Sequence, residues 1–353
     1  MVRVRSVDEA EDVNAEADKD AEADKRTFAP DVEAIAKGGL AKALPEVDAR
    51  LRLAMRGESA GAQSDTDADA LTAKRAASTA EDQAVDIVAC LKQCGDLRGY
   101  GGARLVPRRD YALSELKLNG IEAEKLLSPT ESTISGLRDL ISRAMVVLVG
   151  GWVFAAHPSG SQVTGLLVTG GGALAIDQVA FAGGLEALVL DTLAQATSSS
   201  YRSRLQLHEA AHFLVGYMLG TPVAGYSLGL GTAHVDFQQA KLERKVDGNI
   251  SISEQTMLPL ACMSMAGVAA EAMAFEDVRG QEGDLRDLQR LLNRADPKLS
   301  AQAQQQLTRW AVWQSSGMLK RHEKAFDALT RAMEEGATVA ECLRAIEAAP
   351  KPE

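Results

Sequence analysis

Apolar residues recur at the spacing of a helix face in several segments of the chain, which predicts α-helices there. Between residues 81 and 97, valine and leucine recur at the spacing of one helix face. Residues 282–295 carry leucines at four positions with the same periodicity, which predicts a second amphipathic helix. The fold is therefore expected to be mainly α-helical. Further helices are expected over 301–334 and 338–348, and a short structured segment is expected over 113–129.

The first 80 residues have a different composition. They are small, polar and acidic, and no aromatic residue occurs between Pro30 and Gly99. Such a segment buries too little apolar surface to offset the entropy lost on ordering. Residues 1–80 are therefore expected to be largely disordered, with one helix around 45–56.

A second change occurs after residue 143. Residues 145–156 contain no charged residue, and a longer apolar run follows over 164–190, interrupted by Asp177 and Glu186. The first run is shorter than the ~20 residues that a spanning helix needs. Residues 144–197 are therefore expected to form either a buried helical layer or a helical hairpin in, or half in, a membrane. Basic residues before the first run, Arg138 and Arg143, favour the membrane interpretation.

Length and charge narrow the class of protein. The chain has 353 residues, enough for two ordinary domains and a tail. Its net charge is -11, without a block rich in lysine or arginine, which argues against a nucleic-acid-binding surface. Its four cysteines are too few and too scattered for a disulfide framework. The expected regions are an acidic tail (1–80), a short helical region (81–143), the apolar region (144–197) and a C-terminal domain (198–353).

Within the apolar segment "LQLHEAAHFLVGYMLG" (205–220), three polar residues form an HExxH motif. His208 and His212 are one turn apart, so they lie about 40° from each other around a helix. Their imidazoles can bind one tetrahedral ion, and Glu209, to one side, can act as general base. The alternative is two hydrogen-bonded core histidines without a metal. Because histidine is scarce here, 5 of 353 residues, the metal site is favoured.

A catalytic zinc site needs a third protein ligand. Spacing along the chain leaves three candidates open: His234, in a strand-like segment, Glu271, in a helix of small residues, and Asp284, just before a helix. Asp284, just before a helix, could instead be merely a helix N-cap.

Three segments in this order, "HEAAHFLVGYMLGTPVAGYSL", "MAGVAAEAMAFEDV" and "GQEGDLRDLQRLL", resemble the peptidase domain of FtsH-type zinc metalloproteases, family M41. The resemblance covers roughly residues 200–295 and implies a zincin-like fold, helical with a small sheet. It also implies Zn²⁺ held by His208, His212 and Asp284, with Glu209 as catalytic base. Glu271, on the first acid of the family's AEE, is then expected to support a ligand rather than bind the ion.

The chain departs from that family at several points. Ala211 replaces the glycine of HEAGH, Ala272 replaces the second acid of AEE, and no G-x-x-x-x-G-K-[ST] motif for an ATPase occurs. In this respect the chain resembles the FtsH-like proteins of cyanobacteria and plastids that lack the ATPase domain. That likeness implies a chloroplast location at the thylakoid or envelope membrane.

Two functions follow from these observations. The first is a zinc metalloendopeptidase that hydrolyses unfolded or membrane-protein segments without its own ATPase, with the strand-like segment 223–237 pairing with extended substrate. The second is a zinc-binding but proteolytically weak scaffold or regulatory partner of a complete FtsH-type ATPase complex.

Overall fold

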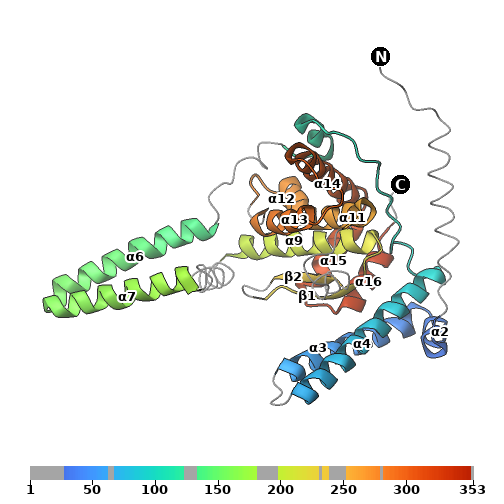
Figure 1. Cartoon of the computed structure of the whole chain (residues 1–353), viewed down its shortest axis with the longest axis horizontal. Helices are drawn as coiled ribbons and strands as arrows, with labels where there is room; N and C mark the ends of the chain where they lie inside the picture. The colour runs from blue at the N-terminus through green and yellow to red at the C-terminus, as the bar shows by residue number, and fades with distance from the viewer. Residues whose placement is uncertain are drawn as a thin grey trace.

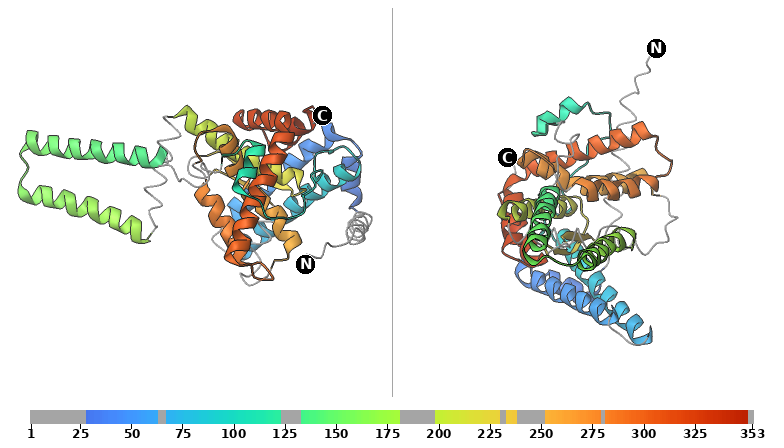
Figure 2. Two further views of the ribbon diagram at one scale, coloured as in Figure 1. Left: turned by 90° about the horizontal axis from the view of Figure 1, so that it is seen from above. Right: turned by 90° about the vertical axis from the view of Figure 1, so that its left-hand side faces the viewer.

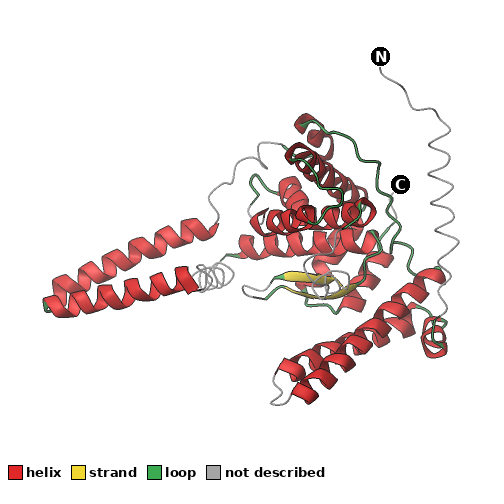
Figure 3. Cartoon of the chain, viewed as in Figure 1, coloured by secondary structure: helices red, strands yellow, loops and turns green. Residues whose placement is uncertain are grey.

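The computed structural model describes residues 28–62, 67–122, 133–180, 198–229, 233–237, 252–278 and 281–350. These residues are mainly helical, as predicted, and they contain one sheet of two short strands (Figures 1 and 3). The elements are α2 (Pro30–Ala36), α3 (Leu40–Ala62), α4 (Asp67–Gln93), η1 (Leu113–Asn119), α6 (Thr133–Ala156), α7 (Gly160–Ala180), α9 (Ser199–Met218), β1 (Val223–Ser227), β2 (His234–Phe237), α11 (Glu254–Ser264), α12 (Ala266–Ala274), α13 (Gln281–Asn293), α14 (Ala301–Arg321), α15 (Glu323–Glu334) and α16 (Val339–Ala348).

Helix α9 runs through the centre of the C-terminal domain, with α11 to α14 on one side and α15 and the two strands on the other (Figure 1). It begins at Ser198, whose side chain accepts a hydrogen bond from the Tyr201 backbone N–H, as an N-cap does. The helix ends at Met218, and the chain turns towards β1 at Gly220, which has a positive φ of 81°. Its second half is buried on almost every side, which explains the nearly continuous apolar sequence around the HExxH motif.

The two strands form an antiparallel hairpin against α9. Tyr226 pairs with Val235, and a bulge interrupts the register between residues 223 and 225. The Phe237 ring lies directly over Gly216 of α9, where an added Cβ would come within 2.3 Å of its Cε1 atom. The predicted strand character of segment 223–237 is confirmed at both ends, while residues 230–232 lie outside the described residues.

The expectation of disorder is wrong for the described part of the first 80 residues. Helices α3 and α4 pack side by side there (Figures 1 and 2), and α3 contains the helix predicted around 45–56. Alanine is the strongest helix former, and the alanine-rich sequence still places Leu44, Val47 and Leu51 in the core. Low aromatic content therefore did not indicate disorder. Residues 1–27 lie outside the described residues.

One side chain fastens this N-terminal helix pair to the C-terminal helix. Asp48 of α3 accepts hydrogen bonds from the Thr338 hydroxyl (2.5 Å) and from the Ala340 backbone N–H (3.0 Å) at the start of α16. Carboxylates at a helix N-terminus satisfy otherwise unpaired N–H groups and interact favourably with the helix dipole. The N-terminal helices are thus part of the folded domain.

We expect Asp48→Ala to lower the free energy of unfolding by about 1–2 kcal/mol, the usual effect of losing a capping side chain. Thermal unfolding followed by circular dichroism measures this change. Glu46→Ala is the matched control, because Glu46 is an exposed residue of the same helix in an i,i+4 pair with Arg50, and such pairs contribute little. Equal destabilisation by both changes would contradict the role given to Asp48.

Helices α6 and α7 project from the body of the molecule as a helical hairpin joined by residues 157–159 (Figures 1 and 2). Six large apolar residues of α6 are exposed, so they do not form the buried layer that was one of the two expectations: Val146, Val147, Leu148, Trp152, Val153 and Phe154. The membrane alternative stays a prediction, and residues 181–197 lie outside the described residues.

Among the described residues, one helical segment is long and apolar enough to cross a membrane, Glu254–Ala274. It comprises α11 and α12, and 72% of it is buried inside the fold, as is usual for core helices of a domain. Val146–Ala156 of α6 is a shorter apolar helix.

Candidate metal centre

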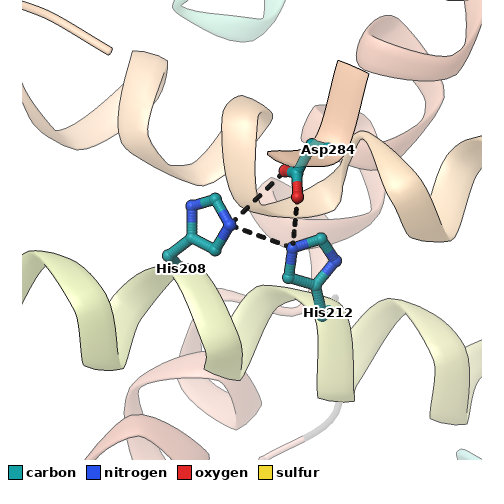
Figure 4. A group of neighbouring side chains, drawn as sticks. All are labelled: His208, His212 and Asp284. Atoms are coloured by element: carbon teal, nitrogen blue, oxygen red, sulfur yellow. Dashed lines mark hydrogen bonds and ion pairs between the residues drawn. The ribbon is translucent and has the colours of Figure 1, made fainter. Parts of the chain in front are cut away.

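Three side chains from two helices converge beside the centre of α9 (Figure 4). His208 and His212 point from α9 towards Asp284 of α13, and their Nε2 atoms lie 3.1 Å apart. The Asp284 carboxylate faces both rings, with Oδ2 at 3.4 Å from the His208 Nε2 atom and Oδ1 at 3.3 Å from the His212 Nε2 atom. A tetrahedral zinc ion with bonds of about 2.0–2.1 Å separates its ligand atoms by roughly 3.3 Å. The cluster therefore has the dimensions of one face of such a site.

The far sides of both rings are fixed by hydrogen bonds. The His212 Nδ1 atom lies 2.7 Å from the Met263 carbonyl oxygen, and the His208 Nδ1 atom lies 2.8 Å from Glu271 Oε1. A carbonyl and a carboxylate accept hydrogen bonds, so both Nδ1 atoms donate. In the neutral rings, the Nε2 lone pairs then face each other and the carboxylate. Histidine ligands of metal ions are held in this way.

The charge balance of the cluster also fits a cation. Asp284 Oδ2 is buried and has no hydrogen-bond partner, an arrangement that calls for an explanation. Burial lowers the pKa of both histidines, but the neighbouring carboxylates, Asp284 foremost, together outweigh burial and raise it. Burial likewise raises the pKa of Asp284, but His212 and His208 outweigh it and hold that pKa well below its usual range. The site favours positive charge between an anionic carboxylate and two imidazoles, so these residues fit a divalent metal ion.

Of the three candidates for the third ligand, the structure brings Asp284 to the two histidines. It keeps the side chains of the other two candidates away from the histidine Nε2 atoms that face Asp284. Among the described residues, His208, His212 and Asp284 are the one group of potential ligands with all ligand atoms within 4.8 Å of one another. His234 is exposed on β2, with its Nε2 atom 3.2 Å from Asp236 Oδ2. Glu271 lies behind His208, where the family resemblance implies a supporting residue.

The expected general base, Glu209, follows His208 on α9 and is buried. Burial raises the pKa of its carboxyl group, and the neighbouring His212 and His208 lower it in part. The charges of Asp284 and His234 also act on it. These interactions place the Glu209 carboxylate beside the cluster, and among the residues that the structure describes no hydrogen bond joins it to the three ligands.

Arg204 was missed in the sequence, although it precedes His208 by one helical turn on the same face of α9. Its guanidinium donates hydrogen bonds to Glu271 Oε2 (3.0 Å) and Asp277 Oδ1 (2.7 Å) and lies 4.1 Å from the Phe275 ring centroid. Arg204 thus holds the Glu271 side chain in place against His208. A buried glutamate that supports a histidine needs a nearby cation. A basic residue one helical turn before His208 was therefore the signal that could have identified Arg204.

We expect Glu271→Gln to weaken zinc binding about 10–100-fold, because the amide is a weaker acceptor for the His208 Nδ1–H group. Competition with a zinc-binding dye measures the affinity. Glu276→Gln, an exposed change on the following turn, is the control and should leave the affinity unchanged. Unaltered binding in Glu271→Gln would show that this contact does not orient the ring.

Gly267, the second residue of α12, leaves room for the ring of His208. A Cβ atom at this position would lie 2.3 Å from the His208 Nε2 atom and 2.4 Å from Cε1. Real side chains do not approach so closely, and the imidazole is held at its other nitrogen by Glu271. Glycine is therefore required at 267 for the ring to face Asp284.

Gly267→Ala should consequently displace His208, weaken zinc binding and lower stability by about 1–3 kcal/mol, as overpacking does. Zinc titration and thermal unfolding of the purified variant measure the two effects. Gly283→Ala is the matched control, because it adjoins Asp284 yet an added Cβ meets nothing within 4 Å. Zinc affinity that is equal in the two variants would contradict the steric role of Gly267.

Comparison of the chain with protein-family models, with curated proteins and with solved structures finds no match. Support for a function therefore comes from the geometry of the cluster, its supporting residues and the motif that carries them.

Proposed function

We propose that the protein is a zinc metalloendopeptidase, similar to the M41 peptidase domain of FtsH-type proteases but without an ATPase motif of its own. The observation that carries this proposal is the convergence of His208, His212 and Asp284 next to a buried glutamate (Figure 4). Two imidazoles, one carboxylate and an adjacent general base are what metal-assisted peptide hydrolysis requires.

Each residue has a distinct task in this proposal. His208, His212 and Asp284 would hold the ion, which, when bound, supplies a Lewis acid that polarises the peptide carbonyl and activates water. Glu209 accepts a proton from the attacking water and delivers it to the leaving nitrogen as the peptide bond breaks. Glu271 and Arg204 keep His208 in the orientation that this chemistry needs.

The β-hairpin beside α9 supports a peptide substrate. Its two strands pair only with each other among the described residues, so each has an outer edge to which an extended peptide can add as a further strand. A substrate must be extended to bind in this way. Because the chain carries no motif for ATP-driven unfolding, we propose unfolded or loosely held protein segments as substrates. The same absence favours the second candidate, a zinc-binding partner of an FtsH-type ATPase complex.

Casein cleavage by the purified full-length protein tests the proposal. Zinc-loaded protein should release peptides, a chelator should stop the reaction, and added zinc should restore it. Cleavage that continues unchanged with the metal removed would contradict a metallopeptidase. Protein that binds one zinc per chain but leaves casein intact would support the scaffold function instead.

A further inference from the structure

Apolar side chains cover helix α6 on several sides. Val146, Val147 and Leu148 are 72%, 72% and 67% exposed, and successive helical residues point about 100° apart. Phe154, two turns further, is 82% exposed. A partner protein covers one face of a helix, and an amphipathic helix therefore carries one apolar stripe. A helix that is apolar on several sides is normally enclosed, either by a protein core or by a membrane, and no described element of the chain encloses α6.

The second helix of the hairpin has the same character. Leu166 and Val168 of α7 are exposed, and no charged residue occurs from 144 to 176. Arg143, exposed immediately before this stretch, lies where basic residues meet lipid headgroups. The charge-free part of the hairpin is also the part that extends farthest from the domain (Figures 1 and 2).

We propose that the α6–α7 hairpin inserts into a lipid bilayer from one side and ends within it, without crossing to the other side. The proposal concerns a different part of the molecule from the metal centre, so it does not rest on the proposed peptidase function.

The length of the apolar helix favours partial insertion. The apolar segment Val146–Ala156 is about 16 Å long at 1.5 Å per residue, roughly half of the ~30 Å hydrocarbon core. A crossing hairpin would therefore draw the charged base of α6 into the core, which is strongly unfavourable.

Some of the polar groups at the hairpin tip are hydrogen-bonded within the hairpin. The Gln162 Oε1 atom accepts a hydrogen bond from the Ser159 backbone N–H (2.9 Å), and the Ser159 and Ser161 hydroxyls lie 3.0 Å apart. Polar groups in the bilayer must be satisfied internally, and these contacts satisfy one backbone N–H and one hydroxyl, while the exposed imidazole of His157 lies 6.5 Å from the Phe154 ring.

Vesicle flotation tests whether the α6–α7 hairpin binds a lipid bilayer. Full-length protein should float with vesicles of phosphatidylcholine and phosphatidylglycerol, and Val147→Asp and Phe154→Asp should each lower the affinity about 100-fold. Leu53→Asp is the matched control, since Leu53 is also an exposed apolar residue, 57% exposed, but lies on α3. Failure of the wild type to float, or equal loss in the control, would overturn the proposal. So would a soluble oligomer that the two hairpin changes dissociate, because a second copy would then cover this surface.

The depth of insertion is tested with Ser159→Cys in a Cys94→Ser background, which removes the exposed native thiol. Brominated lipid tails should quench a fluorophore attached at residue 159, and an impermeant maleimide trapped inside the vesicles should not react with that cysteine. Reaction with the trapped reagent would show that the hairpin crosses and would overturn partial insertion. Zinc content should be the same in all hairpin variants, which separates this result from any failure of the peptidase proposal.

Discussion

Glu209→Gln is expected to lower casein cleavage about 10²–10⁴-fold while the protein keeps its zinc. Glutamine has nearly the same shape as glutamate, but its amide cannot take a proton from water. The side chain is buried on α9 between the two histidines in sequence, and it is not one of the three converging ligands. The change should therefore remove the base and leave the metal ligands in place.

Rates with a fluorogenic casein derivative, together with zinc content and thermal unfolding of the same preparations, measure this effect. Glu276→Gln makes the same chemical change at an exposed position just after α12 and should leave the rate unaltered. Equal activity of wild type and Glu209→Gln would mean that the cleavage comes from another site or from a contaminating protease.

Asp284→Asn is expected to reduce zinc affinity by more than the ~10–100-fold loss given for a supporting residue. The change removes the negative charge that holds both histidines, whose Nε2 atoms lie 3.3 Å and 3.4 Å from the carboxylate oxygens. Two neutral imidazoles from one helix then remain, and a three-ligand site becomes a two-ligand site.

Equilibrium dialysis against zinc buffers measures this loss, and two variants make it specific. Asp287→Asn changes an exposed acid on the same helix, paired with Arg290, and His234→Ala removes the alternative ligand on β2. Both should retain zinc. If zinc is lost in His234→Ala and retained in Asp284→Asn, the third ligand is His234 and not Asp284. That result would remove support for the M41 resemblance.

The sequence alone was sufficient for the part of the site that lies on one helix. The i,i+4 spacing of His208 and His212 fixes their relation whatever the rest of the chain does. Asp284 lies far along the chain on another helix, and its approach depends on how α13 packs. Spacing could not choose it over His234 or Glu271, and only the family resemblance favoured it. Met263 contributes a backbone carbonyl, which leaves no trace in residue identity.

The fold was predicted best where apolar periodicity is strong, as in α13 and α14. It was predicted worst in residues 67–80 of α4 and in the parts of α3 outside 45–56, where the composition was interpreted as disorder. Alanine contributes little apolar area per residue, but it favours the helix and lets two helices approach closely. The contact of Asp48 with α16 joins segments at opposite ends of the chain, so no local pattern could have indicated that these helices belong to the domain.

Zinc K-edge X-ray absorption of the zinc-loaded full-length protein tests the metal centre most directly. Coordination by His208, His212 and Asp284 predicts one zinc per chain with only nitrogen and oxygen neighbours at about 2.0–2.2 Å and the multiple scattering of two imidazoles. The same spectrum from Asp284→Asn should be weak or absent at equal protein concentration. A sulfur neighbour at about 2.3 Å would place the ion on cysteine, and protein that takes up no zinc would leave the cluster without its ion; either result would contradict the account.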